Sequence, residues 1–267
     1  MKLAVAMTVA GSDSGGGAGI QADLKTFAAL GVHGTSAVTA ITAQNTLGVT
    51  DIFELPPRVV RAQIDAVVED MGVAAVKTGM LSSAAIIETV ASAVRDHRLD
   101  WLVVDPVMVA KGGARLLRDD AVDAMRTLLL PLAAVITPNL PEAEVLLGRS
   151  IATLDQRRDA AQELVRLGAR AAVVKGGHAE GDAVDVYADA GQMFELSAAR
   201  IQTTNTHGSG CTFSAAIAAH LALGLDAPDA VRRAKAFISS AIEFGIEIGH
   251  GHGPVNPMFE ARPRGPA

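Results

Sequence analysis

The chain has 267 residues, 49% hydrophobic and 19% charged, and 23 basic against 29 acidic residues give it a net charge of −6. A negative balance argues against a general nucleic-acid binder, which needs basic surface to displace counterions. Only 3% of the residues are aromatic, which leaves little material for base-stacking platforms. The single cysteine, Cys211, excludes an internal disulfide and a cysteine-cluster metal site, and it suits a reducing compartment.

The sequence contains no run near the roughly 18 apolar residues that a membrane span requires. Lys2 and the apolar residues 3–10 read either as a short signal peptide or as a buried first strand. The glycine-rich residues that follow favour the strand. We therefore expect a cytoplasmic protein with no membrane partner, built as one domain over residues 1–267 whose last ~10 residues form a flexible tail.

The predicted elements alternate between short apolar strands and amphipathic helices. In the first half we expect strands over 3–10, 35–42, 49–54 (an edge strand), 74–77 and 101–105, and helices over 18–30, 58–71 and 83–98. Ser83 is the predicted cap of the third helix. In the second half we expect strands over 133–137 and 171–175, a hairpin of 184–187 and 192–196, and helices over 119–129, 142–147, 156–167, 210–223 and 228–248.

Apolar strands without alternation, separated by helices, predict an α/β fold with a mostly parallel sheet covered on both faces. Ligands of such folds bind beyond the carboxyl ends of the strands. Nearly all the unusual residues follow those ends: 11–19, Gln44, Asn45, Gly79, Met80, 105–107, 138–142 and 175–178. This clustering is the first indication of a functional site.

Two glycine-rich segments differ in what they can do. Residues 15–19 fit neither a dinucleotide G-x-G-x-x-G loop nor a P-loop, and they form either a flexible turn or a loop that lets a ligand approach the backbone. Gly208 and Gly210 precede a long predicted helix, and free N–H groups at a helix start bind anions. The same position lowers a thiol pKa, so Cys211 is either a partly ionised thiolate or a buried inert cysteine.

The string Thr206-His207-Gly208-Ser209-Gly210-Cys211-Thr212 resembles the anion-hole motif of the ribokinase-like superfamily. It is most similar to the branch of hydroxymethylpyrimidine/phosphomethylpyrimidine kinases of thiamine biosynthesis. Residues 10–25, 42–46, 137–143 and 174–178 match the same branch, in order along essentially the whole chain. The resemblance implies a ribokinase-like three-layer sandwich, with a central mostly parallel sheet flanked by helices on both faces.

The resemblance also implies an activity. An enzyme of this branch uses ATP and Mg²⁺ to phosphorylate 4-amino-5-hydroxymethyl-2-methylpyrimidine, and then its monophosphate, and it forms a homodimer. The amides of Gly208, Ser209 and Gly210 would hold the transferring phosphoryl group, next to Thr206. Lys175 would approach the ATP phosphates as a point charge, although a surface cation is the alternative.

Two carboxylates are the candidate metal ligands. Asn139 and Glu142 match the family's Asn-x-x-Glu pattern for organising Mg²⁺ and its waters, although Glu142 could instead only stabilise a first helical turn. Asp105 ends an apolar strand and would face the same phosphates or the metal.

Gln44 is the main candidate for reading the pyrimidine, because its amide can pair with both a ring nitrogen and the exocyclic amine. Gly11, Asp23, Met80 and Val107 match positions that line the substrate pocket in the family. Met80 and Val107 could instead be ordinary core residues, and Asp23 could be a helix surface charge.

Cys211 stands where sugar and adenosine kinases of this fold carry an aspartate base. We hypothesise that it assists deprotonation of the substrate hydroxyl and completes the anion hole. The same cysteine occurs in a similar pyridoxal kinase subgroup, so a kinase of vitamin B6 compounds is an alternative function. A binding module that senses a nucleotide or metabolite is a second alternative.

Three histidines have less specific patterns. His207 fits a turn residue better than a ligand or base. His250 and His252 are too few to close a metal site, and we expect a loop after the last helix there. Residues 262–266 are expected to be disordered.

Overall fold

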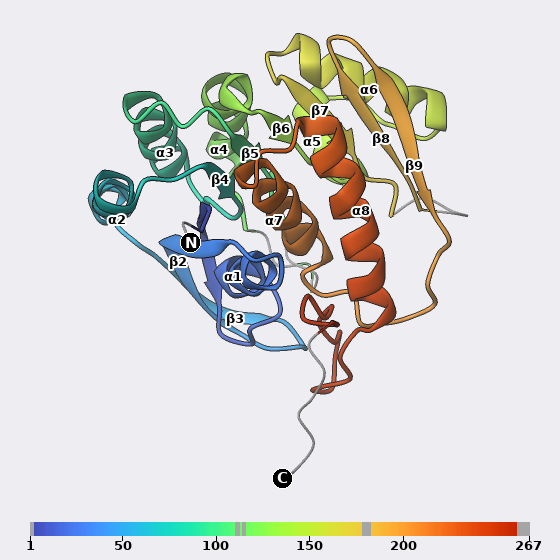
Figure 1. Cartoon of the computed structure of the whole chain (residues 1–267), viewed down its shortest axis with the longest axis horizontal. Coiled ribbons are helices and arrows are strands. Elements are labelled where there is room, and N and C mark those ends of the chain that lie inside the picture. The colour runs from blue at the N-terminus through green and yellow to red at the C-terminus, as the bar shows by residue number, and fades with distance from the viewer. Residues whose placement is uncertain (1–2, 110–112, 114–115, 178–182, 261–267) are drawn as a thin grey trace.

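The computed structural model describes residues 3–109, 113, 116–177 and 183–260. Expectations that fall on Lys2, His178 and residues 262–266 lie outside these ranges. Within the described part, one nine-stranded sheet runs in the order β3-β2-β1-β4-β5-β6-β7-β8-β9 (Figure 1). Its strands are β1 (Val5–Asp13), β2 (His33–Gln44), β3 (Val49–Glu54), β4 (Ala75–Thr78), β5 (Leu102–Val104), β6 (Val135–Ile136), β7 (Ala171–Val174), β8 (Ala183–Asp189) and β9 (Met193–Ala198).

The centre of the sheet is parallel and its edges are antiparallel. Strands β2, β1, β4, β5, β6 and β7 pair in parallel, whereas β3, β8 and β9 join antiparallel. Every residue of β4, β5 and β7 is buried, and β5 and β7 are accordingly continuous apolar runs in the sequence, whereas β4 also buries Lys77 and Thr78. The edge strand β3 is mostly exposed. The mostly parallel sheet and the edge position of 49–54 are therefore confirmed.

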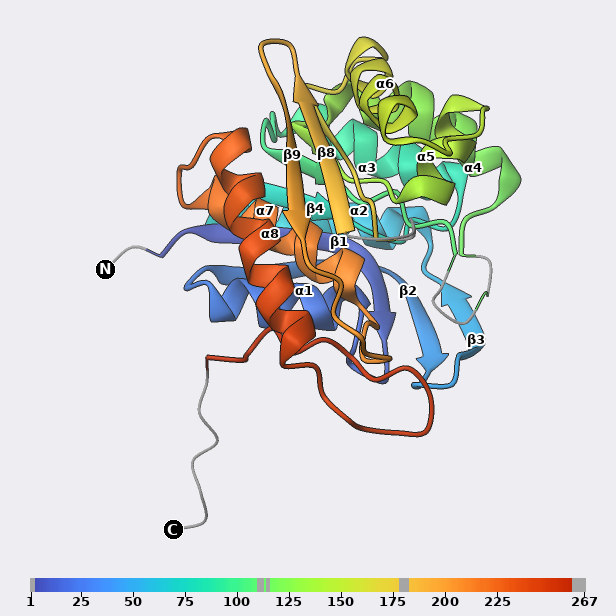
Figure 2. The ribbon, with the colours of Figure 1, turned by 90° about the vertical axis from the view of Figure 1, so that its right-hand side faces the viewer.

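Helices cover the sheet on both faces, which confirms the three-layer sandwich (Figures 1 and 2). One face carries α1 (Gly19–Ala29), α7 (Ser209–Ala222) and α8 (Ala227–Glu243), whose buried side chains share one apolar cluster with the sheet. The other face carries α2 (Pro57–Met71), α3 (Ala84–Asp96), α4 (Asp119–Ala124), α5 (Leu140–Leu147) and α6 (Leu154–Arg166), which pack around a second cluster. The parallel strands consequently end between the two helical layers.

Three predicted helices differ in detail from the structure. The helix predicted over 119–129 is α4 followed by a π-helical turn, η1 (Met125–Leu129), and a 3-10 turn, η2 (Leu130–Leu132). Pro131 explains the change, because it lacks an N–H and its ring clashes with a preceding carbonyl in α geometry. Helix α8 ends at Glu243, five residues before the predicted end, just before Gly245. Ser83 occupies the N-cap of α3, but its side chain makes no capping hydrogen bond.

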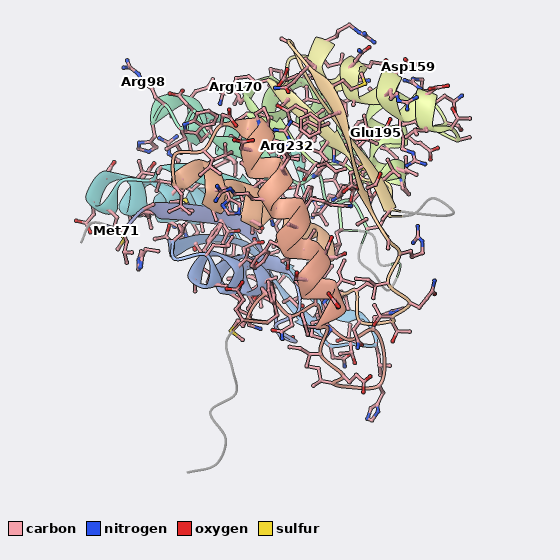
Figure 3. All side chains as sticks on the ribbon, turned by 45° about the vertical axis from the view of Figure 1, so that its right-hand side comes forward. Met71, Arg98, Asp159, Arg170, Glu195 and Arg232 are labelled. Carbon is pink, nitrogen blue, oxygen red and sulfur yellow. The ribbon has the colours of Figure 1, made fainter. Side chains whose placement is uncertain are left out.

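Charged side chains of both signs are mixed over the molecular surface. Figure 3 labels two acidic and three basic residues together with Met71. The guanidinium of Arg170 lies 4.7 Å from the centre of the Trp101 ring, and that of Arg232 lies 4.0 Å from the Phe194 ring. Each of these two guanidinium groups thus stacks on an aromatic ring of the same chain. No helix in the described part of the chain is long and apolar enough to cross a membrane.

A buried ion pair ties α1 to the sheet. Lys77 Nζ on β4 lies 3.0 and 2.9 Å from the two carboxylate oxygens of Asp23 on α1, and neither side chain has exposed surface. Thr8 Oγ1 on β1 donates to the same carboxylate at 2.6 Å. Burial lowers the pKa of Lys77, but the charges of Asp23, Cys211 and Asp105, with the hydrogen bond to Asp23, together outweigh it and hold that pKa above its ordinary value. The lysine therefore keeps its charge inside the fold.

We predict that Asp23→Ala destabilises the protein by about 3–5 kcal/mol, because it leaves a buried ammonium without a counter-charge. The free energy of unfolding from urea titration measures this loss. In the double variant Asp23→Leu/Lys77→Met no buried charge remains, so it should be more stable than Asp23→Ala. If the single and double variants lose the same stability, the unpaired charge is not the cause.

Candidate functional site

The carboxyl ends of the parallel strands bring the predicted site residues to one edge of the sheet. Asp13 and Gln44 end β1 and β2, and Asp105 directly follows β5. Asn139 and Lys175 follow β6 and β7 and are joined by an isolated parallel bridge. Helix α7 begins at the same edge, as the contacts of its first turn with Lys175 and Asp105 show.

The first turn of α7 is the candidate anion site. Gly208 is its N-cap with φ of 77°, and the helix begins at Ser209, earlier than predicted. The first N–H groups of a helix have no partner within it. Ser209 N–H donates back to Thr206 O at 3.3 Å, so the N–H groups of Gly210 and Cys211 are the ones left for a ligand. A Cβ added to Gly210 would lie 3.2 Å from Lys175 Nζ and 3.8 Å from Asp105 Oδ2. The turn, the lysine and the carboxylate are therefore direct neighbours.

Lys175 is not a surface cation. Its Nζ lies 3.1 Å from Asp105 Oδ1, and its side chain is 15% exposed. Burial lowers the pKa of Lys175, but the charges of Asp105 and Glu142 outweigh it and raise that pKa above its usual value. Ser214 Oγ donates to Asp105 Oδ2 at 3.2 Å, which fixes the carboxylate from the α7 side. Lys175 is thus a held positive charge beside the helix N-terminus.

Asn139 and Glu142 form a capping box at the start of α5. Glu142 N–H donates to Asn139 Oδ1 at 2.9 Å, and Asn139 N–H donates to Glu142 Oε2 at 2.8 Å. The Glu142 carboxylate is buried, and burial, reinforced by the charge of Asp105, raises its pKa to about 7 although Lys175 opposes the shift. The helix-start role is therefore confirmed for Glu142, without excluding a second role as a ligand.

The acidic pair fits a divalent cation. Asp105 and Glu142 interact electrostatically in a buried place with Lys175 as their near cation, so an added positive charge would relieve the cost of ionising Glu142. No cluster of three or more His, Cys, Asp or Glu able to hold a metal occurs among the described residues. A cation here would depend on waters or ligand phosphates for its other bonds, which suits Mg²⁺.

Gln44 lies at the opposite end of the site, next to His207. Gln44 Nε2 is 3.3 Å from His207 Nε2, and Thr42 Oγ1 is 3.1 Å from Gln44 Oε1. His207 Nε2 also lies 2.9 Å from Asp13 Oδ2. The backbone of His207 binds the chain after α8, because its N–H donates to Gly253 O and its carbonyl accepts from Val255 N–H. His207 is therefore a buried residue that links the ends of β1 and β2 to the chain after α8.

The residues after α8 form the loop that was predicted for His250 and His252. His252 N–H donates to Thr46 O at 2.9 Å, and the N–H groups of His250 and Gly251 donate to Thr46 Oγ1 at 3.2 Å. This segment thus holds the turn that follows Gln44. We call residues 250–255 the closing segment.

Gly11, Met80 and Val107 lie on the strand ends between these two groups. A Cβ on Gly11 would lie 3.1 Å from Met80 Sδ, so the two residues pack directly together. Met80 is buried and Val107 is half-buried. Asp23 is fully buried, so the helix-surface alternative is wrong. Its carboxylate is taken up by Lys77 and Thr8, and a direct contact with a ligand stays a prediction.

The expectation of a partly ionised Cys211 is wrong for the unliganded protein. Burial raises the pKa of the Cys211 thiol to about 11, and the charges of Asp23 and Asp105 act in the same direction. Lys77 and the Gly19 N–H favour the thiolate but do not outweigh burial. Cys211 is therefore a neutral thiol at neutral pH.

Two residues of the site, Asp13 and Lys77, had no role assigned from the sequence, and a third, His207, was predicted only as a turn residue. Asp13 accepts hydrogen bonds from the N–H groups of Gly15, Gly17 and Ala18, at 2.8, 3.0 and 2.8 Å. It therefore shapes the loop over residues 15–19, and an Asp before consecutive glycines could have indicated this. Lys77 and His207 gave no such signal.

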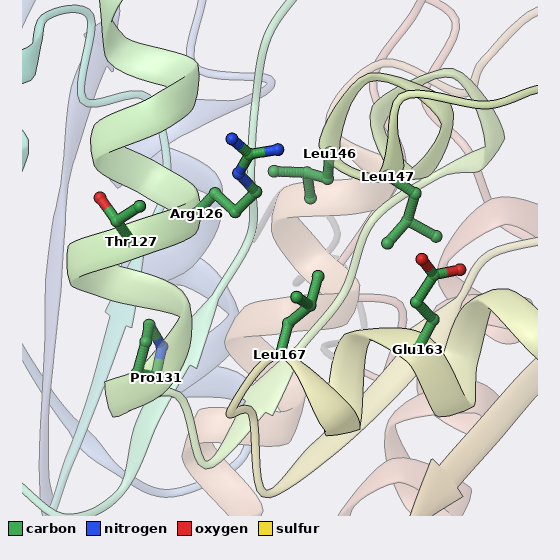
Figure 4. A pocket seen from close by; sticks show the side chains of 7 residues that line it. All are labelled: Arg126, Thr127, Pro131, Leu146, Leu147, Glu163 and Leu167. Atoms are coloured by element: carbon green, nitrogen blue, oxygen red, sulfur yellow. The ribbon is translucent and has the colours of Figure 1, made fainter.

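A separate pocket lies away from the carboxyl ends of the parallel strands (Figure 4). Pro131 and Leu167, which line it, precede β6 and β7, so the pocket lies towards the amino ends of the strands. Its other side chains are Arg126, Thr127, Leu146, Leu147 and Glu163. This set includes no residue of the α7 turn and neither Lys175 nor Asp105.

Known proteins resemble the whole chain. Residues 13–256 match the family model described as phosphomethylpyrimidine kinase. A hydroxymethylpyrimidine/phosphomethylpyrimidine kinase from Haemophilus influenzae is 51% identical over 96% of this chain and 97% of its own. A thiamine biosynthesis bifunctional protein from Geobacter sulfurreducens is also 51% identical over 96% of this chain, which spans 52% of that longer protein. The crystal structure of an ADP complex of Bacillus subtilis pyridoxal kinase superposes with a TM-score of 0.90, at 41% identity over 97% of this chain and 98% of the other.

The raised pKa of Glu142 predicts a pH dependence of stability. A carboxyl group whose folded-state pKa is about 7, against 4.5 ordinarily, contributes its full stability below pH 4.5 and loses it as the pH rises to about 7. Glu142→Gln keeps the capping box but cannot ionise. The variant should gain about 2 kcal/mol of unfolding free energy relative to the parent between pH 5 and pH 8. Urea titrations in chelator-treated buffer measure this, and an equal difference at both pH values would contradict it.

Proposed function

We propose that this chain, which belongs to the phosphomethylpyrimidine kinase family, transfers the γ-phosphoryl group of ATP to the hydroxymethyl oxygen of 4-amino-5-hydroxymethyl-2-methylpyrimidine, and then phosphorylates the monophosphate. The observation that carries the proposal is the geometry at the start of α7. The N-terminal turn of α7 lies beside Lys175 and Asp105, at the sheet edge that also holds Gln44.

The α7 turn suits a transferring phosphoryl group. Phosphoryl transfer needs positioning and charge neutralisation more than covalent chemistry. Gly208, in the left-handed conformation, opens the turn, and the N–H groups of Gly210 and Cys211 supply fixed donors. Ser209 N–H donates to Thr206 O at 3.3 Å and would exchange this partner for the phosphoryl group. Thr206 precedes this turn, and Lys175 adds the point charge that meets the ATP phosphates.

Mg²⁺ would be held by Glu142 and Asp105, with Asn139 orienting Glu142 through the capping box. When bound with ATP, the ion neutralises phosphate charge. The chain's own part is to present two carboxylates beside one lysine, in a place where the carboxylates repel each other without a cation. ADP in the related pyridoxal kinase structure supports nucleotide binding in this fold.

The pyrimidine would lie between Gln44 and the α7 turn. The Gln44 amide offers a donor and an acceptor to the ring, and the apolar surface comes from Gly11, Met80 and Val107. Asp23 contributes through Lys77, which it holds beneath the site.

Cys211 completes the anion turn in this proposal. Its second task, to assist removal of the hydroxyl proton, requires that the bound state favour the thiolate. Lys77 and the helix N-terminus are the groups that act in that direction. In the unliganded protein the thiol holds its proton.

The protein would act as a cytoplasmic homodimer. The β2–β3 hairpin supports this proposal, because Leu47, Ile41 and Phe53 are 67%, 51% and 65% exposed, and Ile41 pairs with Phe53 in the ladder. Two copies could bury these side chains against each other.

The assay that tests the function compares two substrates. With MgATP, the purified protein should phosphorylate hydroxymethylpyrimidine and its monophosphate with a kcat/KM about 100-fold higher than for pyridoxal. Pyridoxal kinase is the second candidate, because the B. subtilis enzyme shares this fold at 41% identity. A preference for pyridoxal would favour that candidate, and absence of product from either ring would rule out both.

Two glycine variants distinguish a loss of phosphate binding at the α7 turn from a loss of folding stability. A methyl on Gly210 would lie 3.2 Å from the flexible end of Lys175 and 3.8 Å from Asp105 Oδ2. Gly210→Ala should therefore fold normally yet lower kcat about 100-fold, by occupying the place proposed for the phosphoryl group. A Cβ on Gly208 would lie 1.8 Å from Gly17 O at a φ of 77°, so Gly208→Ala should also lose about 2 kcal/mol or more of stability. Thermal unfolding and turnover measure both effects. Full activity of Gly210→Ala would contradict the assignment of the turn.

A further inference from the structure

Three side chains from distant parts of the sequence meet beside the pyrimidine site. His207 Nε2 lies 2.9 Å from Asp13 Oδ2 and 3.3 Å from Gln44 Nε2. The ring packs directly on the loop over residues 15–19, because a Cβ added to Gly17 would lie only 2.4 Å from His207 Cδ2. Gly17 N–H also donates to Asp13 Oδ2 at 3.0 Å, so the imidazole and this loop share the same carboxylate oxygen.

Asp13 determines which ring nitrogen of His207 carries a hydrogen. Burial raises the pKa of Asp13, but hydrogen bonds from His207, Ala18 and Gly15 outweigh it and hold that pKa below its ordinary value. The carboxylate is therefore ionised and can only accept. If His207 Nε2 were also an acceptor, two lone pairs would face each other at 2.9 Å. The hydrogen consequently lies on Nε2.

This hydrogen constrains the Gln44 amide. An NH₂ group next to His207 Nε2–H would place donor against donor at 3.3 Å. Rotating the amide by 180° puts its carbonyl oxygen beside His207 and its NH₂ beside Thr42 Oγ1. Thr42 Oγ1 can then accept from Gln44 and give its single hydrogen to Ser12 O, 2.9 Å away. In that arrangement each donor has an acceptor, so it is the favoured one.

We propose that His207, held by Asp13, is a positioning residue that fixes the order in which Gln44 presents its carbonyl and its NH₂ to the substrate ring. The inference rests on the proposed function, in which Gln44 reads the pyrimidine. One lone pair of Oε1 and one hydrogen of Nε2 remain for the ring. A 4-aminopyrimidine offers a donor amine beside an acceptor nitrogen, whereas a 4-oxo ring offers an acceptor oxygen beside an N–H donor. A fixed amide therefore accepts the first pattern and rejects the second.

The first experiment needs no substrate. Long-range ¹H–¹⁵N NMR spectra of the unliganded full chain, labelled at histidine nitrogens, report the tautomer of each ring, and His207→Gln assigns the His207 signals by their loss. We expect the hydrogen of His207 on Nε2 at pH 8. A hydrogen on Nδ1 would overturn the proposal, whatever the enzyme phosphorylates.

The second experiment measures ring selectivity as the ratio of kcat/KM for hydroxymethylpyrimidine to that for its 4-oxo analogue. The parent ratio should be about 100 or more. His207→Leu should lower it at least about 10-fold, mainly through the KM of the amino substrate. His207→Gln places an amide N–H near the position of Nε2 and should restore most of the ratio.

Two results separate this proposal from a structural role and from the function itself. If His207→Leu slows both substrates in parallel and keeps the ratio, or if His207→Gln fails to restore it, His207 does not set the amide and the proposal is wrong. If His207→Leu does not fold, the proposal is tested by the selectivity ratio of His207→Gln and by the tautomer of His207 in the parent protein. A parent protein that phosphorylates neither ring would defeat the proposed function, while the tautomer still tests His207.

Discussion

The ion pair of Lys77 with Asp23 lies entirely inside the molecule, between the first helix and the centre of the sheet. Its cost in lost hydration is met only while both charges and the Thr8 hydroxyl stay in contact. That requirement locks α1 against β1 and β4, and hence fixes the loop over residues 15–19 that joins β1 to α1. The α7 turn packs on the same loop, since Gly208 leaves no room for a Cβ against Gly17 O. The position of the anion site therefore depends on a pair that never meets solvent.

The charges of the site explain how an acidic protein can hold a polyphosphate. Lys77 and Lys175 are each paired with a carboxylate, and Glu142 is an additional acid close to Asp105. The unliganded site thus has no surplus positive charge. A polyphosphate would instead be bound by backbone amides, by the partly buried Lys175 and by an added cation. Recognition is local, and the mixed charges of the surface in Figure 3 are consistent with this.

Much of the site could be predicted, because a parallel sheet places the residues after its strands at one edge. Gln44, Asp105, Asn139 and Lys175 were found by that rule. The predictions that failed concern two properties that a local sequence pattern does not contain: how deeply a side chain lies in the fold, and which distant residues it contacts. The motif shows that Cys211 starts a helix but not that the half-buried thiol is desolvated by its surroundings, so the expected shift of its pKa had the wrong sign. Lys77 resembles an ordinary strand end, and nothing near His207 in sequence indicates that Asp13, 194 residues earlier, faces it.

The closing segment, residues 250–255, follows every strand and helix of the described fold, yet it binds both the turn after Gln44 and the backbone of His207. During synthesis on the ribosome, the sheet and both layers of helices can assemble before this segment emerges. A nascent chain would then already have its phosphate turn but an open ring-binding side. The last contacts to form are thus those that support the ring-binding side. The contacts with Thr46 join parts of the chain about two hundred residues apart, which are slow to meet.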